Sequence, residues 1–333
     1  MILAGDIGGT KTTLALFAQR REFPGFARPA VSLATYDSRA FPRFEEILRD
    51  FSERQRPSLA AASIGIAGPV RGNRCQTTNL PWMVDGAELA HSLGLRELSL
   101  INDLEAVGYG IDVLRPDELA ELQPGAADAT GNRAVIAAGT GLGEAGLYWD
   151  GTAHHPFATE GGHADFAPTD ELELGLLQFL QRQHGHVSWE RVVSGPGLVE
   201  IYRYLQQGGE VHLDGEPPEL AAEMASGDPG AVISRHAASG TSRLCRRALD
   251  LFVKLYAAEA GNLALKTMAT GGVYIGGGIA PKNLERMTSG TFIESFRSKG
   301  RMRPLLEAMP VRMLLNADTA LLGAAHHAAA LAR

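Results

Sequence analysis

Residues 2–17 of the chain read ILAGDIGGTKTTLALF, a pattern of strand, glycine turn and strand. In it, two apolar segments flank a glycine-rich turn at residues 5–10. Glycine adopts positive φ and lets the backbone approach closely, so the stretch predicts a tight β-hairpin. Consecutive backbone N–H groups in such a turn can converge on the oxygens of a phosphate. The hairpin is therefore a candidate phosphate site, where Thr10 adds a hydroxyl and Lys11 a cation.

The combination of strand and glycine turn recurs twice. The stretch AVIAAGTGLGEAGLYW at residues 134–149 predicts a second hairpin, with its turn at residues 139–143. The stretch GVYIGGG at residues 272–278 predicts a strand that ends in glycines. None of the three matches the Walker motif or the dinucleotide-binding GxGxxG motif. A single glycine turn commonly does no more than reverse the chain, but three at strand ends favour phosphate binding. The two hairpins also indicate two related lobes.

The rest of the chain alternates between strand-like and helical patterns. Helices are expected within residues 41–56, 172–183, 198–206, 243–265 and 319–332, and strands at residues 61–67, 98–101 and 311–315. Glycine- and proline-rich loops are expected at residues 123–132 and 207–219. This order of elements predicts an α/β protein with helices packed on mixed sheets.

Composition and charge narrow the range of functions. A chain of 333 residues is too long for one ordinary core, so two domains or lobes are expected. The net charge of -7 argues against a nucleic acid or an anionic membrane surface as the main partner. The two cysteines, Cys75 and Cys245, lack metal-site spacing and suit a reducing compartment. Neither a signal peptide nor a membrane span is expected, so the predicted location is the cytoplasm.

The dipeptide Asn102-Asp103 lies where an apolar strand ends and a helical pattern begins. A carboxylate at the carboxyl end of a buried strand points into the crevice where open α/β sheets bind their ligands. There, Asp103 could accept the proton of a substrate hydroxyl, as the base of a kinase does. Both residue types are also favoured helix N-caps, which satisfy N–H groups of the first turn. The pair alone leaves both interpretations open.

Polar residues beside glycines provide further candidates. Asp6 could hold Mg²⁺ near a phosphate, usually through water, or it could accept the hydrogen bond of an Asx turn. Glu160 and His163 flank two glycines and could bind neighbouring sugar hydroxyls, although His163 could equally be a satisfied turn histidine. His163 with Asp165 is only a weak metal motif. His184 and His186 fit a flexible surface better than a metal site.

Glu190 follows Ser188, a plausible cap, in the first turn of an expected helix, where its alternative role is to stabilise the helix dipole. No serine-nucleophile elbow with a credible triad is present, and neither cysteine has an obvious histidine partner. What remains is a carboxylate base, groups that bind hydroxyls and cradles for phosphate. That inventory favours phosphoryl transfer to an alcohol.

Together these motifs resemble the bacterial ATP-dependent glucokinase family, the type that lacks the zinc motif of repressor-type (ROK) sugar kinases. The matching segments, in family order and over nearly the whole chain, are residues 5–10, 101–103, 139–143, 160–166, 194–198 and 276–279. EGGHADF at 160–166 and SGPGL at 194–198 are specific to this family, whereas GDIGGT is shared with ROK kinases. With two cysteines, the chain cannot assemble the Cys₃His zinc site of ROK kinases.

The resemblance implies an actin-like (ribonuclease H-like) ATPase fold with two α/β lobes around a deep cleft. A small lobe would comprise residues 1–104 plus about 312–333, and a large lobe about 105–311. It also implies a homodimer that phosphorylates glucose with ATP. Asp103 would contact the sugar as the general base on the 6-hydroxyl, and Mg²⁺ would lie near Asp6, probably through water. The other hydroxyls would contact Asn102, Glu160, His163 and Glu190. ATP would contact Gly5, Asp6, Ile7, Gly8, Gly9, Thr10, Gly139, Thr140 and Gly141, with Gly277 and Gly278 on its adenosine side.

Two departures from the family pattern are visible. Leu104 stands where the family more often has Phe, and Glu144 stands where a small apolar residue is common. A carboxylate facing ATP phosphates would be unfavourable, so Glu144 is expected to point elsewhere. The alternative functions are a kinase for fructose, mannose or N-acetylglucosamine, a non-catalytic sugar sensor and an actin-like ATP switch. The sequence also leaves open whether ATP or polyphosphate is the phosphoryl donor.

Overall fold

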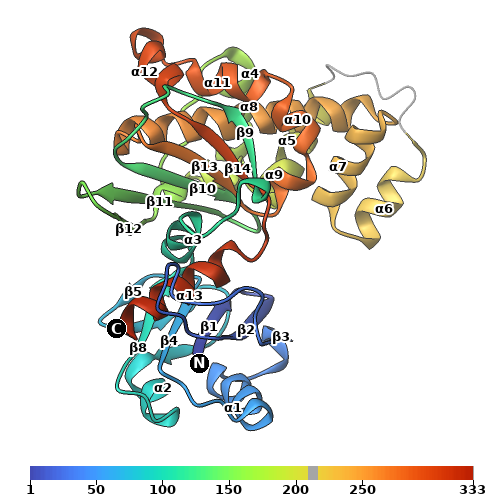
Figure 1. The fold of residues 1–333 in the computed structure, drawn as a ribbon. Helices are drawn as coiled ribbons and strands as arrows, with labels where there is room; N and C mark the ends of the chain where they lie inside the picture. Colours follow the sequence, from blue (N-terminus) through green and yellow to red (C-terminus); the bar gives the residue numbers. More distant parts are fainter. Residues whose placement is uncertain (209–216, 333) are drawn as a thin grey trace. The chain divides into compact units, whose positions relative to one another are not determined.

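The computed structural model describes residues 1–208 and 217–332, which form two compact units (Figure 1). Unit 1 comprises Met1–Leu119, Ala145–Ala158 and Asn316–Arg333, and unit 2 comprises Ala120–Glu144 and Thr159–Leu315. Most of the loop expected at residues 207–219 lies outside the described residues. Each unit carries one of the two predicted glycine hairpin turns.

Unit 1 is built on a five-stranded sheet in the order β3-β2-β1-β4-β8. The strands are β1 (Ile2–Ile7), β2 (Lys11–Phe17), β3 (Ser32–Asp37), β4 (Ala61–Ile66) and β8 (Leu98–Asn102). The first predicted hairpin is confirmed, because β1 pairs antiparallel with β2. β1, β4 and β8 run parallel, with Ile7 opposite Ile66 and Ile66 opposite Asn102. The first glycine turn and Asp103 therefore follow strand ends at the same edge of one sheet.

The extent of the first turn differs from the prediction. The turn was expected at residues 5–10, but Gly5, Asp6 and Ile7 are paired in β1 and only residues 8–10 connect the strands. A Cβ at Gly5 would lie 3.0 Å from Leu14 Cδ2 and 3.1 Å from Ile64 Cγ1. Gly5 therefore allows close packing on the sheet rather than a reversal of the chain.

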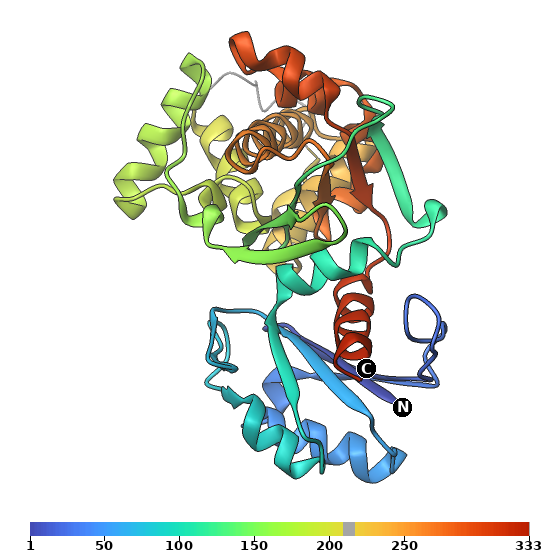
Figure 2. The same ribbon diagram turned by 60° about the vertical axis from the view of Figure 1, so that its left-hand side comes forward.

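The two faces of this sheet are covered by different helices. Side chains alternate along a strand, so Leu3 and Ile7 pack in one core while Ile2 and Ala4 pack in another. The first core contains α1 (Phe44–Gln55) and the second contains α13 (Thr319–Leu331). Figure 2 shows α13, in red, beside the strands of unit 1. The remaining elements are η1 (Ser38–Ala40), β5 (Val70–Arg71), β6 (Arg74–Gln76), β7 (Met83–Asp85), α2 (Gly86–Ser92), α3 (Asp103–Ile111) and η2 (Pro116–Glu118).

The second sheet has six strands in the order β12-β11-β10-β13-β14-β9. They are β9 (Leu119–Gln123), β10 (Arg133–Ala138), β11 (Leu142–Trp149), β12 (His154–Thr159), β13 (Gly272–Gly276) and β14 (Val311–Leu314). β10 and β11 form the second predicted hairpin, and β13 is the third predicted strand. β13 runs parallel to both β10 and β14. The second and third glycine turns consequently follow neighbouring strands at one edge of this sheet.

Helices make up most of the rest of unit 2. They are α4 (Glu171–His184), α5 (Gly195–Gln207), α6 (Leu220–Ser226), α7 (Pro229–Ser239), α8 (Arg243–Thr267), α9 (Ile279–Lys282), α10 (Leu284–Thr288), α11 (Thr291–Arg297) and α12 (Arg303–Ala308), with short 3₁₀ turns η3 (Gly161–His163), η4 (Trp189–Arg191) and η5 (Gly300–Met302). α8 is the central helix, and its buried face includes Leu249, Phe252 and Tyr256. No helix within residues 1–208 and 217–332 is long and apolar enough to cross a membrane.

The start of α5 was predicted too late. The helix was expected from residue 198, but it begins at Gly195 after the cap Ser194, whose Oγ accepts a hydrogen bond from Gly197 N–H at 3.0 Å. Gly195 and Pro196 look like loop residues in the sequence. Proline in the first turn of a helix loses nothing, because its missing N–H would have no partner there.

Candidate active site

Asn102 ends β8 and is the N-cap of α3. Its Oδ1 accepts a hydrogen bond from Leu104 N–H at 2.9 Å, and its own N–H donates to Glu105 Oε2 at 2.9 Å, which completes a capping box. Its Nδ2 donates to Gly68 O at 3.1 Å. The amide nitrogen carries two hydrogens, so Nδ2 keeps one donor for another partner, whereas the capping box occupies Oδ1.

Asp103 is the first residue of α3 and is partly exposed. One of its carboxylate oxygens lies 3.1 Å from Leu104 N, so the side chain bends toward the helix terminus. The positive end of the helix dipole favours a carboxylate at this position. The N-cap interpretation is therefore confirmed for Asn102. Asp103 is not the capping residue, and its carboxylate lies next to the cap.

The first glycine turn is fastened by η1. Gly8 N–H donates to Lys11 O at 2.9 Å across the turn. Ser38 binds two carbonyls of the turn: its Oγ donates to Gly8 O at 2.9 Å, and its N–H donates to Thr10 O at 2.9 Å. A Cβ at Gly9 would lie 2.8 Å from Asn79 Cβ, so only glycine fits there without a shift. Nothing in the sequence identified Ser38, because it acts across 28 or more residues.

Asp6 lies at the end of β1, close to the turn, and its charge interacts with that of Asp318 just before α13. Burial, together with the charge of the Asp318 carboxylate, raises the pKa of Asp6 to about 6. Two carboxylates that repel each other form a donor set that suits a hydrated divalent cation. These residues therefore fit the predicted Mg²⁺ position, with water completing the coordination.

The second and third glycine turns meet at one pocket in unit 2. The pocket has a volume of about 790 Å³, and Gly139, Thr140, Gly195 and Gly278 line it. Gly195 N–H donates to Gly139 O at 2.8 Å, which joins the start of α5 to the second turn. Gly277 has φ +78°, and a Cβ there would overlap the backbone of Ala138. Glycine at this position thus lets the third turn lie directly against the end of β10.

Tyr256 in the core of unit 2 forms hydrogen bonds with the backbone at the ends of β10 and β13. Its hydroxyl accepts a hydrogen bond from Ala138 N–H at 3.0 Å and lies 2.9 Å from Gly276 O and 3.1 Å from Ile136 O. The side chain is fully buried on α8. Burial raises the pKa of the Tyr256 hydroxyl above its ordinary value, so it stays a neutral donor. Its contacts lie 20 to 120 positions away in sequence, and sequence reasoning missed it.

Three helices form the rest of the pocket. The further lining residues are Pro196, Leu198, Val199, Glu200 and Arg203 from α5, Asp228, Pro229, Gly230, Ala231, Ser234, Arg235 and Ala238 at α7, and Ile279, Lys282 and Asn283 at α9. Apolar walls with a few polar groups are typical of small-molecule sites. The backbone turns at one end and this mixed wall suit the phosphates and the nucleoside of a nucleotide. Of the residues that line this pocket, the sequence had identified Gly139, Thr140 and Gly278 as contacts of ATP.

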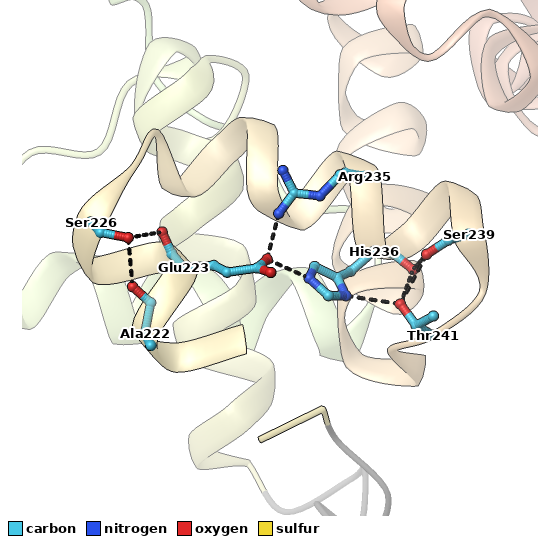
Figure 3. A network of polar contacts seen from close by, with 7 residues as sticks. All are labelled: Ala222, Glu223, Ser226, Arg235, His236, Ser239 and Thr241. Carbon is cyan, nitrogen blue, oxygen red and sulfur yellow. Dashed lines mark hydrogen bonds and ion pairs between the residues drawn. The ribbon is translucent and has the colours of Figure 1, made fainter. Parts of the chain in front are cut away.

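A polar network braces the α7 wall of the pocket (Figure 3). Glu223 on α6 pairs with Arg235, which lines the pocket, and accepts a hydrogen bond from His236 Nε2 at 2.8 Å. His236 Nδ1 lies 2.8 Å from Thr241 Oγ1. The hydrogen bond from His236 lowers the pKa of the Glu223 carboxyl, as does the guanidinium of Arg235. The network keeps Glu223 ionised and ties α6 to α7.

In unit 2, Leu142 at the start of β11 lies against Glu190 and against Gly162, the glycine beside His163. Glu160 and His163 are exposed at either end of the Gly161–Gly162 pair in η3. A Cβ at Gly162 would overlap the backbone of Leu142. Leu142 N–H donates to Glu190 Oε2 at 2.9 Å. Asn102 and Asp103 belong to unit 1.

One expectation about this region needs correction. Glu190 lies in the 3₁₀ turn η4 rather than in the first turn of an α-helix, and Ser188 makes no capping hydrogen bond with its side chain. Asp165 is not paired with His163 as a metal site, because its Oδ1 lies 2.7 Å from His186 Nε2. Among residues 1–208 and 217–332, no group of three His, Cys, Asp or Glu side chains could hold a metal ion.

Comparison with known proteins identifies the family. The glucokinase family model matches residues 3–331. The chain belongs to the glucokinase family. A glucokinase from Nostoc sp. is 44% identical over 99% of this chain and 99% of its own length.

Solved structures agree with this membership. The crystal structure of a glucokinase from an Antarctic psychrotroph has a TM-score of 0.82 and 30% identity, and covers 98% of each chain. A ROK family glucokinase from Streptomyces griseus, solved in complex with glucose and AMPPNP, has a TM-score of 0.65 and covers 98% of each chain; at 22% identity it shows a shared fold alone. The predicted family, the actin-like ATPase fold and the activity of an ATP-dependent glucose kinase are thereby confirmed.

Proposed function

We propose that this glucokinase transfers the γ-phosphoryl group of ATP to the 6-hydroxyl of glucose, with Asp103 as the general base. The position of Asp103 carries the proposal. It is a partly exposed carboxylate at the carboxyl end of a parallel strand, next to a capped helix start and at the same sheet edge as the first glycine turn. Open α/β sheets bind ligands at such edges. Asp103 accepts the hydroxyl proton as the new oxygen–phosphorus bond forms.

The remaining sugar hydroxyls contact Asn102, Glu160, His163 and Glu190 in this proposal. Asn102 Nδ2 keeps one unused donor hydrogen beside the cap, and Glu160 and His163 are exposed. Glu190 is tied through one oxygen to Leu142 N–H, which leaves its other oxygen for a hydroxyl. Fixed donors and acceptors of this kind orient a substrate at little further cost in conformational entropy.

ATP is assigned to the glycine turns and to the pocket of unit 2. The backbone at Gly139, Thr140 and Gly141 binds phosphates, Gly277 and Gly278 lie on the adenosine side, and residues 5–10 bind the phosphates from unit 1. The pocket volume of about 790 Å³ supports this assignment, because nucleotide-sized ligands occupy pockets of that scale.

Mg²⁺ is proposed beside Asp6. When bound, the ion neutralises charge on the transferred phosphoryl group. Asp6 holds it from β1, and repulsion from Asp318 provides the electrostatic reason for a cation there. We further propose a cytoplasmic homodimer, which sedimentation equilibrium of the purified protein would test.

A coupled assay that varies both substrates tests the function. Glucose, fructose, mannose and N-acetylglucosamine are each offered with Mg-ATP and with polyphosphate, and sugar phosphate is measured. The proposal expects the highest kcat/KM for glucose with ATP. A higher value for another sugar or for polyphosphate would contradict it, and ATP-dependent polymers without sugar phosphate would indicate an assembly protein.

A further inference from the structure

Two buried carboxyl groups meet in the core of unit 2. Glu144 follows the second glycine turn in β11 and is 2% exposed, and Glu259 on α8 is 0% exposed. Their side chains lie within hydrogen-bonding reach of each other. Two carboxylates can be hydrogen-bonded to each other only when one of them carries a proton. The position of Glu144, away from the pocket lining, also agrees with the expectation that it does not face phosphates.

The neighbouring side chains stabilise a negative charge on Glu259 more than on Glu144. Asn262 Nδ2 donates to Glu259 Oε2 at 2.7 Å, and Lys266 Nζ lies 3.4 Å from Glu259 Oε1. Lys299, which donates to Asn262 Oδ1 at 2.6 Å, also acts on Glu259 through its charge. In contrast, the buried Oε1 of Glu144 receives no N–H or hydroxyl donor among residues 1–208 and 217–332. Glu259 is therefore the member that stays ionised, and Glu144 is the member that needs the proton.

Electrostatics agrees with this distribution. Burial raises the pKa of Glu144, the Glu259 carboxylate raises it further, and Lys266 opposes the change. Burial also raises the pKa of Glu259, but Asn262, Lys266 and Lys299 oppose that change. The buried hydroxyl of Tyr256, also on α8, is a further titratable group on which the charge of Glu144 acts. Neighbouring carboxyl groups in a dry core cannot both ionise without a large cost.

Glu144 also supports the turn that carries Glu160 and His163. A Cβ at Gly161 would overlap the Glu144 carboxylate, so Gly161 lies directly on it. The backbone is linked as well: Thr159 Oγ1 donates to Glu144 O at 3.1 Å, and Gly161 N–H donates to Thr159 Oγ1 at 3.2 Å. Any outward shift of the Glu144 carboxylate therefore displaces the η3 turn.

We propose that Glu144 and Glu259 share one proton, and that this acid pair is a positioning element that holds Glu160 and His163 in place for glucose. The role in glucose binding rests on the proposed assignment of Glu160 and His163. Loss of the proton at alkaline pH leaves two negative charges in contact, which pushes Glu144 against Gly161. Glucose affinity then falls, while the ATP pocket on the other side of the second turn keeps its shape.

The test compares wild type with Glu144→Gln, which is neutral at every pH and can still donate a hydrogen bond to Glu259. KM for glucose, KM for ATP and kcat are measured from about pH 6 to about pH 9.5, because this range brackets the raised pKa of a buried carboxyl group. The wild type should show a several-fold rise in glucose KM at the alkaline end with little change in ATP KM. Glu144→Gln should show a flat glucose KM. An unchanged alkaline rise in this variant would overturn the proposal.

Glu173→Gln is the matched control, because Glu173 is a carboxyl on α4 that is equally buried, at 1% exposed, and is paired with Lys254. It should keep the alkaline rise of the wild type. Glu144→Ala, which removes the support altogether, should raise glucose KM at every pH, and Glu144→Gln should restore it. Equal glucose KM for Glu144→Ala and wild type would overturn the positioning role.

Difference infrared spectroscopy gives a readout that is independent of activity. The carbonyl band of a protonated carboxyl should be present in the wild type at neutral pH and lost in Glu144→Gln. Its absence from the wild type would overturn the shared proton. If glucose is not phosphorylated at all, the proposed function fails while the band remains. If Glu160→Gln and His163→Ala keep the wild-type glucose KM, these residues do not bind glucose, and the positioning role of the acid pair fails with that assignment. The shared proton would still stand, because the infrared band tests it separately.

Discussion

Asn102 Oδ1 accepts a hydrogen bond from Leu104 N–H at 2.9 Å. This bond joins the two residues that flank Asp103, the proposed catalytic base. The sequence left two interpretations of this dipeptide open, a helix cap or a pair that binds substrate. The capping box shows that the two can coexist, because Asn102 provides the cap. The helix start fixes the backbone of Asp103, and a fixed backbone limits the directions in which its carboxylate can point.

The cap and the sugar contact of Asn102 can be separated by substitution. Asn102→Ser keeps a capping oxygen but loses the Nδ2 group, whereas Asn102→Ala loses both. Loss of the cap in Asn102→Ala should lower the free energy of unfolding by about 1 kcal/mol, and Asn102→Ser should lose only a fraction of that. Both variants should raise glucose KM. Urea unfolding and steady-state kinetics measure the two effects, and a wild-type glucose KM in Asn102→Ser would rule out the sugar contact.

Gly277 and Gly278 make a matched pair for the nucleotide pocket. Gly277→Ala places a Cβ at φ +78° and against the backbone of Ala138, whereas a Cβ at Gly278 meets no atom within 4 Å. The left-handed conformation alone should cost about 1–2 kcal/mol of folding free energy, and the overlap adds to it. We expect Gly277→Ala to lower Tm and raise ATP KM, with Gly278→Ala far milder in both. Equal effects of the two changes would contradict the role of Gly277 in joining the turns.

Tyr256→Phe should weaken the attachment of the second and third glycine turns to the core of unit 2. The substitution removes the acceptor of the buried Ala138 N–H and leaves that group without this partner. A buried donor without its partner costs about 1–3 kcal/mol. Denaturant unfolding should report that loss, and ATP KM should rise. Tyr148→Phe provides the control, because Tyr148 is 56% exposed on β11 and should change stability by no more than about 0.5 kcal/mol.

His327 predicts an acid-dependent loss of stability in unit 1. Its Nδ1 lies 3.0 Å from Ser63 Oγ, between α13 and β4, and burial lowers its pKa to about 4, with the charge of His326 contributing. The folded state binds this proton less readily than the unfolded chain does. Stability is therefore complete above the unfolded pKa near 6.5 and is lost as the pH falls toward 4.

The loss assigned to His327 amounts to roughly 3 kcal/mol at most, at about 1.4 kcal/mol for each unit of pKa change. Urea unfolding at several pH values from 7 down to about 4 measures it for wild type and for His327→Gln, which is neutral throughout this range. The variant should show a shallower decline with falling pH. Parallel curves for the two proteins would assign the acid sensitivity to other groups.

Sequence patterns predicted those features that depend on neighbours along the chain. The hairpins, the start of α3 at Asn102 and the long helix α8 follow from local periodicity and capping preferences, and each is present. Gly5 was wrongly assigned to the turn. A glycine is needed at this position because Leu14 and Ile64 pack closely against it, and no local sequence pattern encodes those contacts.

The supports of the candidate site could not be predicted. Ser38 fixes the first turn, Tyr256 fixes the second and third, and Glu259 faces Glu144, and each acts across a sequence distance that only the folded sheet brings together. Sequence motifs mark the residues that contact ligands, because backbone cradles and polar clusters have recognisable compositions. The side chains behind them are ordinary core residues by type, so only the structure identifies them.

Asp103→Asn separates proton acceptance by Asp103 from glucose binding. The substitution is nearly isosteric and keeps a side-chain oxygen near Leu104 N–H, but it removes the proton acceptor. Glucose affinity, measured by equilibrium titration, should stay close to that of the wild type, while kcat for sugar phosphate formation should fall by about 10²–10⁴-fold. A near-normal kcat in Asp103→Asn with unchanged stability would contradict the assignment of Asp103 as the general base.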